Sequence, residues 1–385
     1  VNHTGDVIDY EEGSYAYRNK EDYPYRDASG TEFDDRDYAG TGTFPPLDPN
    51  VSFPYTPTFN PPSDATVKGP AWLNDPIYYH NRGNSTFVGE NSQYGDFFGL
   101  DDLFHEHPVV VDGMIDIHQN MITEFGIDGF RVDTVKHVSD GFWEEFVPAI
   151  FDHATSLGDD DFIMFGEVFG ESVEFRSRYS TELDFEGTLD FGFDSAAKRF
   201  ASASAPTTEL ADFFASDDWY TDSDSSAHGL AKFIGNHDTG RFALDIRTSN
   251  PGSDDAEQVA RIELGQALNF FTRGRPVVYY GDEQGFVGDG GDQDARQNMF
   301  PSQVASYNDD DLIGTDATTA DDNFDPTHPL YTAIGELAAV REAHPALATG
   351  AQLHRVSESA AGIYAFSRID RDERVEYVVA LNNSE

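Results

Sequence analysis

Three acidic side chains in the middle of the chain each lie at or just after the end of a short apolar segment. They are Asp133, Glu167 and Asp238. Arg131 lies two residues before Asp133, so on a strand both side chains point the same way and the guanidinium keeps the carboxylate ionised. An ionised, oriented Asp can act as a nucleophile, whereas the apolar neighbours of Glu167 would raise its pKa and suit a general acid. Each feature alone is more often a salt bridge or a solvated acid, so the three must be considered together.

The segments around these acids predict alternating helices and strands. Apolar residues at spacings of three and four predict helices over 114–125 and 259–271. Short apolar runs predict strands over 129–133, 162–165, 189–191, 231–234 and 276–280. This alternation indicates parallel βα units, and polar residues just after the strands mark the catalytic face of a (β/α)8 barrel. Acids that converge on one such mouth fit glycoside cleavage, in which one carboxylate attacks and another protonates the leaving oxygen.

The rest of the chain differs from this pattern. Residues 10–95 hold Pro and Gly clusters among many aromatics, which predicts an irregular but ordered excursion. Apolar runs at 363–366 and 375–381 predict an antiparallel hairpin. We therefore expect a catalytic (β/α) barrel over 1–9 and 96–338, the excursion over 10–95, and a partial C-terminal antiparallel β domain over 339–385. The glycine-rich segment 288–292 is interpreted as a substrate-side loop.

Taken in order, these segments resemble the motifs of the α-amylase family of glycoside hydrolases (family 13). Segment 129–133 resembles the family's Gly-x-Arg-x-Asp motif, and 236–238 its Asn-His-Asp motif. Residues 1–3 resemble the end of the Asp-x-x-x-Asn-His motif at barrel strand 3. Residues 100–103 resemble Leu-Pro-Asp-Leu with Asp101 in place of Pro, and 274–283 resemble the strand 8 motif. The resemblance covers almost the whole chain.

The resemblance implies a retaining mechanism with a role for each matching residue. Asp133 matches the nucleophile, Glu167 the general acid/base and Asp238 the transition-state stabiliser. Five further residues match positions that bind the sugar: His3, Arg131, Lys136, His137 and His237. Of these, Lys136 and His137 resemble the pair that α-amylases place at the aglycone subsites.

The resemblance also implies a Ca²⁺ site between the barrel and the excursion. The matching ligands are Asn2, Asp102 and the carbonyl oxygen of His137, and an all-oxygen set with a carboxylate suits calcium. The alternative is that Asp101 and Asp102 simply belong to an acidic surface.

The family barrel has eight strands, and the motifs found here cover strands 3 to 8. Strands 1 and 2 would precede Val1, and the C-terminal β domain is expected to be incomplete at Glu385. The fold class expected is thus α/β, a TIM-type barrel in a sequence truncated at both ends.

The composition limits the partners and the habitat. The chain has 71 acidic and 24 basic residues in 385, a net charge of −47, with five lysines and no cysteine. Nucleic acid and anionic membranes attract cationic faces, so neither is an expected partner. An Asp-rich, Lys-poor chain that still holds 14% aromatics indicates a globular protein adapted to high salt, where like charges are screened. The substrate expected is an α-glucan, met by a secreted monomer outside the cell.

Three other functions compete with an endo-acting α-1,4-glucan hydrolase. A transglycosylase or an α-glucosidase would use the same scaffold, because the aglycone site sets whether water or sugar is the acceptor. A carbohydrate binder without activity would be expected to have lost one of the three acids. A non-functional truncation product is the third alternative.

Overall fold

The computed structural model of the chain describes residues 1–288 and 292–384. The substrate-side loop predicted at 288–292 therefore falls largely outside the described residues. The chain divides into two compact units, which are described separately. Unit 1 comprises Val1–Phe169 and Glu182–Glu186, and unit 2 comprises Gly170–Thr181 and Gly187–Glu385.

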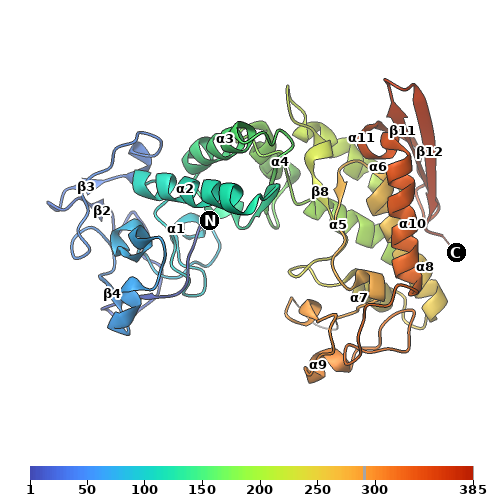
Figure 1. Cartoon of the computed structure of the whole chain (residues 1–385), viewed down its shortest axis with the longest axis horizontal. Helices are drawn as coiled ribbons and strands as arrows, with labels where there is room; N and C mark the ends of the chain where they lie inside the picture. Colours follow the sequence, from blue (N-terminus) through green and yellow to red (C-terminus); the bar gives the residue numbers. More distant parts are fainter. Residues whose placement is uncertain (289–291, 385) are drawn as a thin grey trace. The chain divides into compact units, whose positions relative to one another are not determined.

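The first part of unit 1 has little regular structure, as its Pro and Gly clusters predict (Figure 1). Its elements are β1 (Ile8–Tyr10), β2 (Tyr25–Arg26), β3 (Glu32–Phe33), β4 (Pro57–Phe59) and α1 (Asn91–Tyr94), joined by short 3₁₀ turns. Strands β1 and β4 pair antiparallel, as do β2 and β3. Aromatic packing replaces a sheet core here: the ring of Phe104 lies 4.9 Å from Tyr25 and 5.1 Å from Phe44, centroid to centroid. The segment is therefore ordered by side chains more than by backbone ladders.

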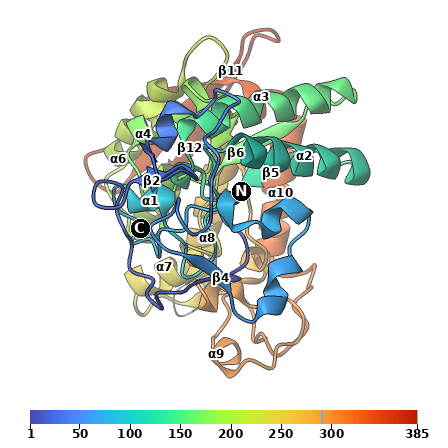
Figure 2. The ribbon, with the colours of Figure 1, turned by 90° about the vertical axis from the view of Figure 1, so that its left-hand side faces the viewer.

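The second part of unit 1 follows the predicted alternation. Its elements are α2 (Pro108–Phe125), β5 (Gly129–Val132), α3 (Asp140–Ser156) and β6 (Ile163–Gly166). Helix α2 ends where Gly126 adopts the left-handed conformation that favours glycine. Strands β5 and β6 pair parallel, with Gly129 opposite Ile163 and Val132 opposite Gly166. Helices α2 and α3 lie side by side in both ribbon views (Figures 1 and 2).

Unit 2 is mostly helical. Its helices are α4 (Val173–Thr181), α5 (Phe191–Ala197), α6 (Thr208–Ala215), α7 (Phe242–Ser249), α8 (Asp255–Phe271), α9 (Ala305–Asn308), α10 (Pro329–Ala343) and α11 (Pro345–Thr349), with a π-helical turn at Lys198–Ser202. Its strands are β7 (Gly187–Thr188), β8 (Ala231–Lys232), β9 (Arg275–Pro276), β10 (Ala351–Val356), β11 (Ile363–Asp370) and β12 (Val375–Asn382). One apolar core joins α5, α6, α7, α8 and α10 to β11 and β12.

Three of the predicted strands are shorter or displaced in unit 2, and the strand expected over 231–234 is present only as β8. The strand expected over 189–191 stops early, because the side chain of Asp190 accepts a hydrogen bond from the N–H of Phe193 and begins α5. The strand expected over 276–280 is reduced to β9, since its parallel partner β8 is only two residues long. The C-terminal hairpin is confirmed as β11 and β12, and β10 adds a third antiparallel strand that the sequence did not predict.

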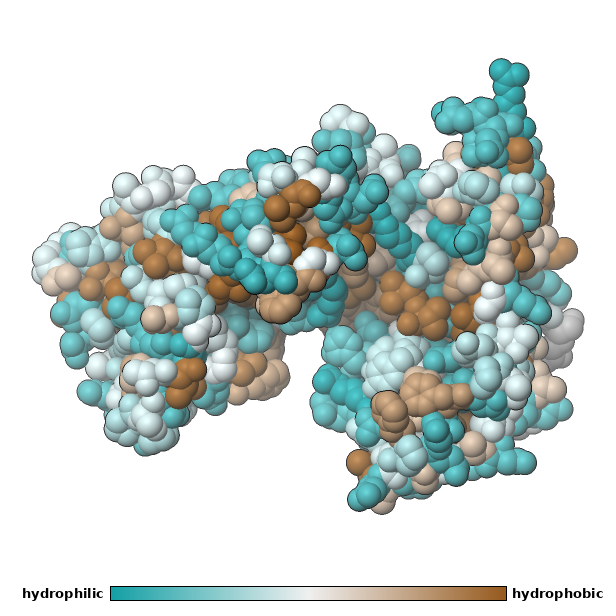
Figure 3. Space-filling view, viewed as in Figure 1, coloured by the Kyte–Doolittle hydropathy of each residue, from teal (hydrophilic) through white to brown (hydrophobic). Residues whose placement is uncertain are grey.

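Charge is distributed unevenly between surface and interior. Hydrophilic side chains cover much of the visible face of each unit (Figure 3). All five lysines lie within the described residues and none of them is exposed: Lys232 is fully buried, and Lys20, Lys68, Lys136 and Lys198 are half-buried.

Within the described residues, no helix is both long and apolar enough to cross a bilayer.

Candidate active site

Asp133 and Glu167 follow directly on the paired strands β5 and β6. The parallel ladder continues past the strands, because Glu167 N–H donates to Val132 O over 2.8 Å and Val135 N–H donates to Glu167 O over 3.1 Å. The Glu167 carboxylate also accepts a hydrogen bond of 2.8 Å from the N–H of Thr134, the residue after Asp133. Backbone hydrogen bonds thus tie the candidate acid/base to the segment that carries the candidate nucleophile.

Arg131 and Asp133 form the ion pair that their spacing predicts, between Nη1 and Oδ1. The Asp133 side chain is 51% exposed, whereas Glu167 is buried at 8%. An accessible, paired carboxylate suits attack on a substrate, and a carboxyl shielded from water suits proton transfer.

Close packing sets the position of Glu167. Gly166 precedes it, and a Cβ atom at this glycine would lie 2.9 Å from Cγ2 of the fully buried Val135. Thr134 has a φ of +57°, a left-handed turn that leads the chain from β5 into the 3₁₀ turn Val135–His137. Only a residue without a side chain lets the two strand ends approach this closely.

Four more of the predicted residues lie around Asp133 in unit 1. The His3 ring stacks on Phe97 at 5.0 Å, and burial lowers the pKa of His3 to about 4, which keeps the imidazole neutral at neutral pH. The other three contact the neighbouring backbone and side chains. Lys136 Nζ donates to Phe169 O over 2.6 Å, His137 Nδ1 lies 2.7 Å from Ser92 O, and Asn2 Oδ1 accepts from Thr134 Oγ1 over 2.7 Å.

His237 and Asp238 lie in unit 2, in the loop after β8. Asn236 shapes this loop, because its Oδ1 accepts from the N–H groups of Asp238 and Thr239, each over 2.8 Å. His237 Nε2 lies 3.1 Å from Asp238 Oδ2, and Arg296 Nη2 lies 3.6 Å from Asp238 Oδ1. The Asn of the Asn-His-Asp motif therefore builds the turn that presents the other two residues.

Asp101 and Asp102 are both buried, so their assignment to an acidic surface is wrong. Asp101 pairs with Lys68 Nζ at 2.5 Å and accepts from the N–H groups of Val7 and Ile8. The backbone next to Asp102 is paired with Asn2, because Leu103 N–H donates to Asn2 O over 2.8 Å. Burial holds the pKa of Asp102 well above its usual range.

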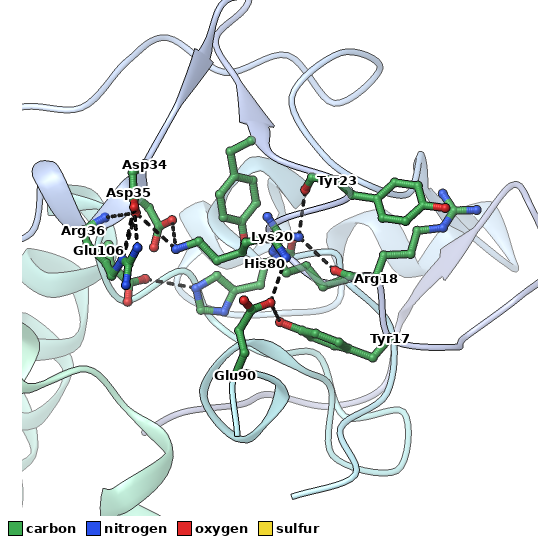
Figure 4. A network of polar contacts seen from close by, with 12 residues as sticks. Tyr17, Arg18, Lys20, Tyr23, Asp34, Asp35, Arg36, His80, Glu90 and Glu106 are labelled. Carbon is green, nitrogen blue, oxygen red and sulfur yellow. Dashed lines mark hydrogen bonds and ion pairs between the residues drawn. The ribbon is translucent and has the colours of Figure 1, made fainter. Parts of the chain in front are cut away.

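Sequence reasoning missed His80 and Glu106, which line the same buried region. His80 Nδ1 lies 2.6 Å from Asp102 Oδ2. On the other side of the ring, His80 Nε2 lies 3.0 Å from Glu106 Oε2 (Figure 4). Burial lowers the pKa of His80 and raises that of Glu106. A neutral imidazole is therefore favoured, with one ring nitrogen within hydrogen-bond distance of each carboxyl group. No periodic or motif signal in the sequence marks this arrangement.

The aromatic residues between 72 and 98 differ in exposure, and Phe87 and Phe98 are the two that are exposed. Tyr79, Tyr94 and Phe97 are buried, but the Phe98 side chain is 86% exposed. Phe98 has a φ of +53° and its ring lies 5.3 Å from Phe87, which has a φ of +61°. Bulky residues rarely adopt this backbone conformation, so the exposed ring is held there at a cost.

Parallel strands that end in carboxylates, followed in the chain by a small β domain, are typical of glycoside hydrolases built on a (β/α)8 barrel. Residues 1–350 match the family model described as "Alpha amylase, catalytic domain". The chain belongs to the α-amylase family, glycoside hydrolase family 13. Membership confirms the fold class of a TIM-type barrel with a C-terminal β domain. The strand count, the truncation and the domain boundaries stay predictions.

Known relatives include hydrolases and transferases. The chain is 49% identical to the alpha-amylase of Streptomyces lividans over all 385 of its residues, which correspond to 42% of that protein. It is 28% identical over 341 residues to the cyclomaltodextrin glucanotransferase of Klebsiella oxytoca, covering 80% of this chain and 47% of that one. The solved alpha-amylase of Geobacillus thermoleovorans complexed with acarbose aligns with a TM-score of 0.64 at 26% identity, covering 81% of this chain and 62% of that one. The chain thus spans less than half the length of these two curated relatives.

Proposed function

We propose that the protein hydrolyses internal α-1,4-glucosidic bonds of starch-like glucans with retention of configuration. The observation that carries this proposal is the hydrogen bonding that links Glu167 to the segment of Asp133. The Glu167 carboxylate accepts a hydrogen bond from the N–H of the residue after Asp133, at the paired ends of β5 and β6. The identity to an alpha-amylase supports the substrate class.

In the first step, Asp133 attacks the anomeric carbon while Glu167 donates its proton to the bridging oxygen. The glycosidic bond breaks, a glycosyl ester forms on Asp133, and the shortened glucan leaves with the proton. In the second step, Glu167 takes a proton from water, the water oxygen bonds to the anomeric carbon, and the Asp133 carboxylate is released. Arg131 pairs with the Asp133 carboxylate and holds its orientation.

The remaining motif residues bind the sugar in this proposal. Asp238 holds the distorted ring through its hydroxyls, with His3 and His237 as further hydrogen-bond partners. Lys136 and His137 contact the aglycone side, and their backbone segment directly follows Asp133 and Thr134.

A second candidate function is glucan transfer to a sugar acceptor. Similarity to a cyclomaltodextrin glucanotransferase supports it, and so does the exposed ring of Phe98 in the same unit as Lys136 and His137. An aromatic face that stacks on an incoming sugar would favour sugar over water as the acceptor. An α-glucosidase on the same scaffold would instead release single glucose units from chain ends.

The residues proposed for Ca²⁺ fit a hard cation. Asp102 Oδ1 is fully buried and has no hydrogen-bond partner among the described residues. Asn2 Nδ2 is likewise buried and unpartnered among them, and a half-turn of this amide would present its oxygen instead. The described residues contain no group of three His, Cys, Asp or Glu side chains suited to a metal, but this set needs only one carboxylate. With the carbonyl of His137, Asn2 and Asp102 would hold Ca²⁺, which would fix the excursion to the segment after β5.

We further propose that the protein works at high salt, as a secreted monomer. The net charge of −47 and the withdrawal of all five lysines from the surface support the salt adaptation. At molar salt the screening length falls to about 3 Å, so the exposed carboxylates hardly repel one another.

The test is digestion of soluble starch in molar KCl with Ca²⁺, followed by NMR of the new anomeric protons. The wild type should release α-anomeric oligosaccharides, and the Asp133→Asn variant should release none. A ladder of oligosaccharides supports endo-hydrolysis, cyclic or lengthened products support transfer, and glucose alone supports an α-glucosidase. A folded wild type that releases nothing would overturn the catalytic assignment and leave a glucan binder.

A further inference from the structure

His80 connects two buried carboxylates in unit 1. It is 1% exposed, and its two ring nitrogens lie 2.6 Å from Asp102 Oδ2 and 3.0 Å from Glu106 Oε2. Its backbone N–H also donates to the carbonyl of Asp102 over 3.0 Å. Asp102 is therefore held by His80 at both its main chain and its side chain.

The imidazole cannot turn away from this position. Its ring centroid lies 4.7 Å from Phe104, 4.9 Å from Tyr94 and 6.5 Å from Tyr25. Lys20 Nζ lies 4.5 Å from the centroid of the Tyr94 ring. It also pairs with the buried Asp35 in the same region (Figure 4). Three rings and two carboxylates thus fix the orientation of His80 in a fully buried site.

The two oxygens of Asp102 consequently differ. Oδ2 accepts from His80, while Oδ1 is buried without a partner among the described residues. An unpartnered buried carboxylate oxygen is costly unless a cation takes it up. Without the bond from His80, the carboxylate would be free to rotate and either oxygen could take any available donor.

We propose that His80 is a positioning residue that fixes the rotamer of Asp102 so that Oδ1 is presented as a cation ligand. This inference rests on the proposed calcium site. Outer-sphere hydrogen bonds to ligating side chains are worth about 10–100-fold in metal affinity. His80 should therefore govern calcium affinity without touching the ion.

A pair of variants separates this role from simple packing. In His80→Asn the amide nitrogen falls near the position of Nδ1 and still donates to Asp102. In His80→Gln the amide reaches the position of Nε2 and keeps the contact with Glu106 but loses that with Asp102. Both variants leave a similar gap among the aromatic rings, so the calcium-free melting temperature should fall by a similar amount in each.

Calcium titration of the calcium-free protein by calorimetry in KCl is the measurement. We expect His80→Gln to bind Ca²⁺ about 10–100-fold more weakly and His80→Asn to stay near wild type. Equal affinities in the two variants would overturn the role of His80. Asp102→Asn tests the calcium site itself. If wild type and Asp102→Asn bind Ca²⁺ alike, or neither binds it, the proposed calcium site is wrong, whatever the His80 variants show.

Glu106→Gln keeps the test decisive if the His80 variants do not fold. The introduced amide still donates to Nε2, so the bond from Nδ1 to Asp102 persists and calcium affinity should stay near wild type. A tenfold loss of calcium affinity in Glu106→Gln would show that the contact between His80 and Glu106, not the contact with Asp102, sets the affinity. That result would contradict the proposal.

Discussion

Gly166→Ala is predicted to displace the general acid/base. The added Cβ would lie 2.9 Å from Val135 Cγ2, 3.4 Å from its Cβ and 3.5 Å from its Cγ1. Carbon atoms pack at about 3.5–4.0 Å, so the segment that carries Gly166 and the segment that carries Val135 must separate by roughly 0.6–1 Å. Val135 is fully buried and its N–H is bonded to Glu167 O, so the strain falls on the contact between Glu167 and the Thr134 segment.

Two magnitudes follow from this displacement. Overpacking of a close-packed site costs about 1–3 kcal/mol of unfolding free energy. A misplacement of about 1 Å in a catalytic group costs on the order of 100-fold in rate. We therefore expect kcat on a maltooligosaccharide to fall by roughly 10–100-fold, with a loss of about 1–3 kcal/mol in urea unfolding.

A matched control and a rescue variant make this prediction specific. Gly5→Ala adds the same methyl group where no atom lies within 4 Å, and should leave both kcat and stability unchanged. Val135→Ala removes the clashing methyl groups, so the double variant Gly166→Ala/Val135→Ala should recover activity relative to Gly166→Ala. Wild-type kcat and stability in Gly166→Ala would refute the claim that this contact positions Glu167.

Three further predictions concern pH, salt and sugar stacking. Burial raises the pKa of Asp194 to about 6 from 3.8, so the folded state holds the proton to higher pH and loses about 3 kcal/mol of stability as the pH rises from about 4 to 6. Asp194→Asn should reduce the fall in urea-unfolding free energy over that range, in which Asp101 and Asp282 also titrate, and an unchanged slope would contradict this interpretation. With a net charge of −47, the melting temperature should rise steadily from about 0.1 M to molar KCl as the screening length shortens; a flat curve would argue against salt adaptation. Phe98→Ala should leave the melting temperature unchanged, because the ring is 86% exposed, but should weaken use of long oligosaccharides about 10-fold or more, the loss expected for a stacked aromatic ring.

The sequence could locate the site segments because their signals are local. Apolar runs predicted β5 and β6, and the spacing of Arg131 and Asp133 predicted their ion pair. The extent of β9 could not be predicted, because it depends on a partner strand more than forty residues away in the chain.

Other features of the site depend on packing that no local pattern records. The exposure of Phe98 follows from a left-handed backbone that its residue type disfavours. The role of His80 emerges only when the excursion folds back so that residues 80, 102 and 106 share one buried pocket. The resemblance to the family implied Asp102 as a candidate ligand but not the group that orients it.

The withdrawal of all five lysines from the surface has a practical consequence for studying this protein. Acylating reagents attack an unprotonated, accessible amine, and here four lysines are partly buried as residues, while Lys232 is fully buried with its amine held against the carbonyls of Asn269 and Thr272. Lysine modification should therefore be slow in the folded chain and should proceed through transient opening. The order in which the five lysines are labelled, followed by mass spectrometry, would report which parts of the fold open first as salt is removed.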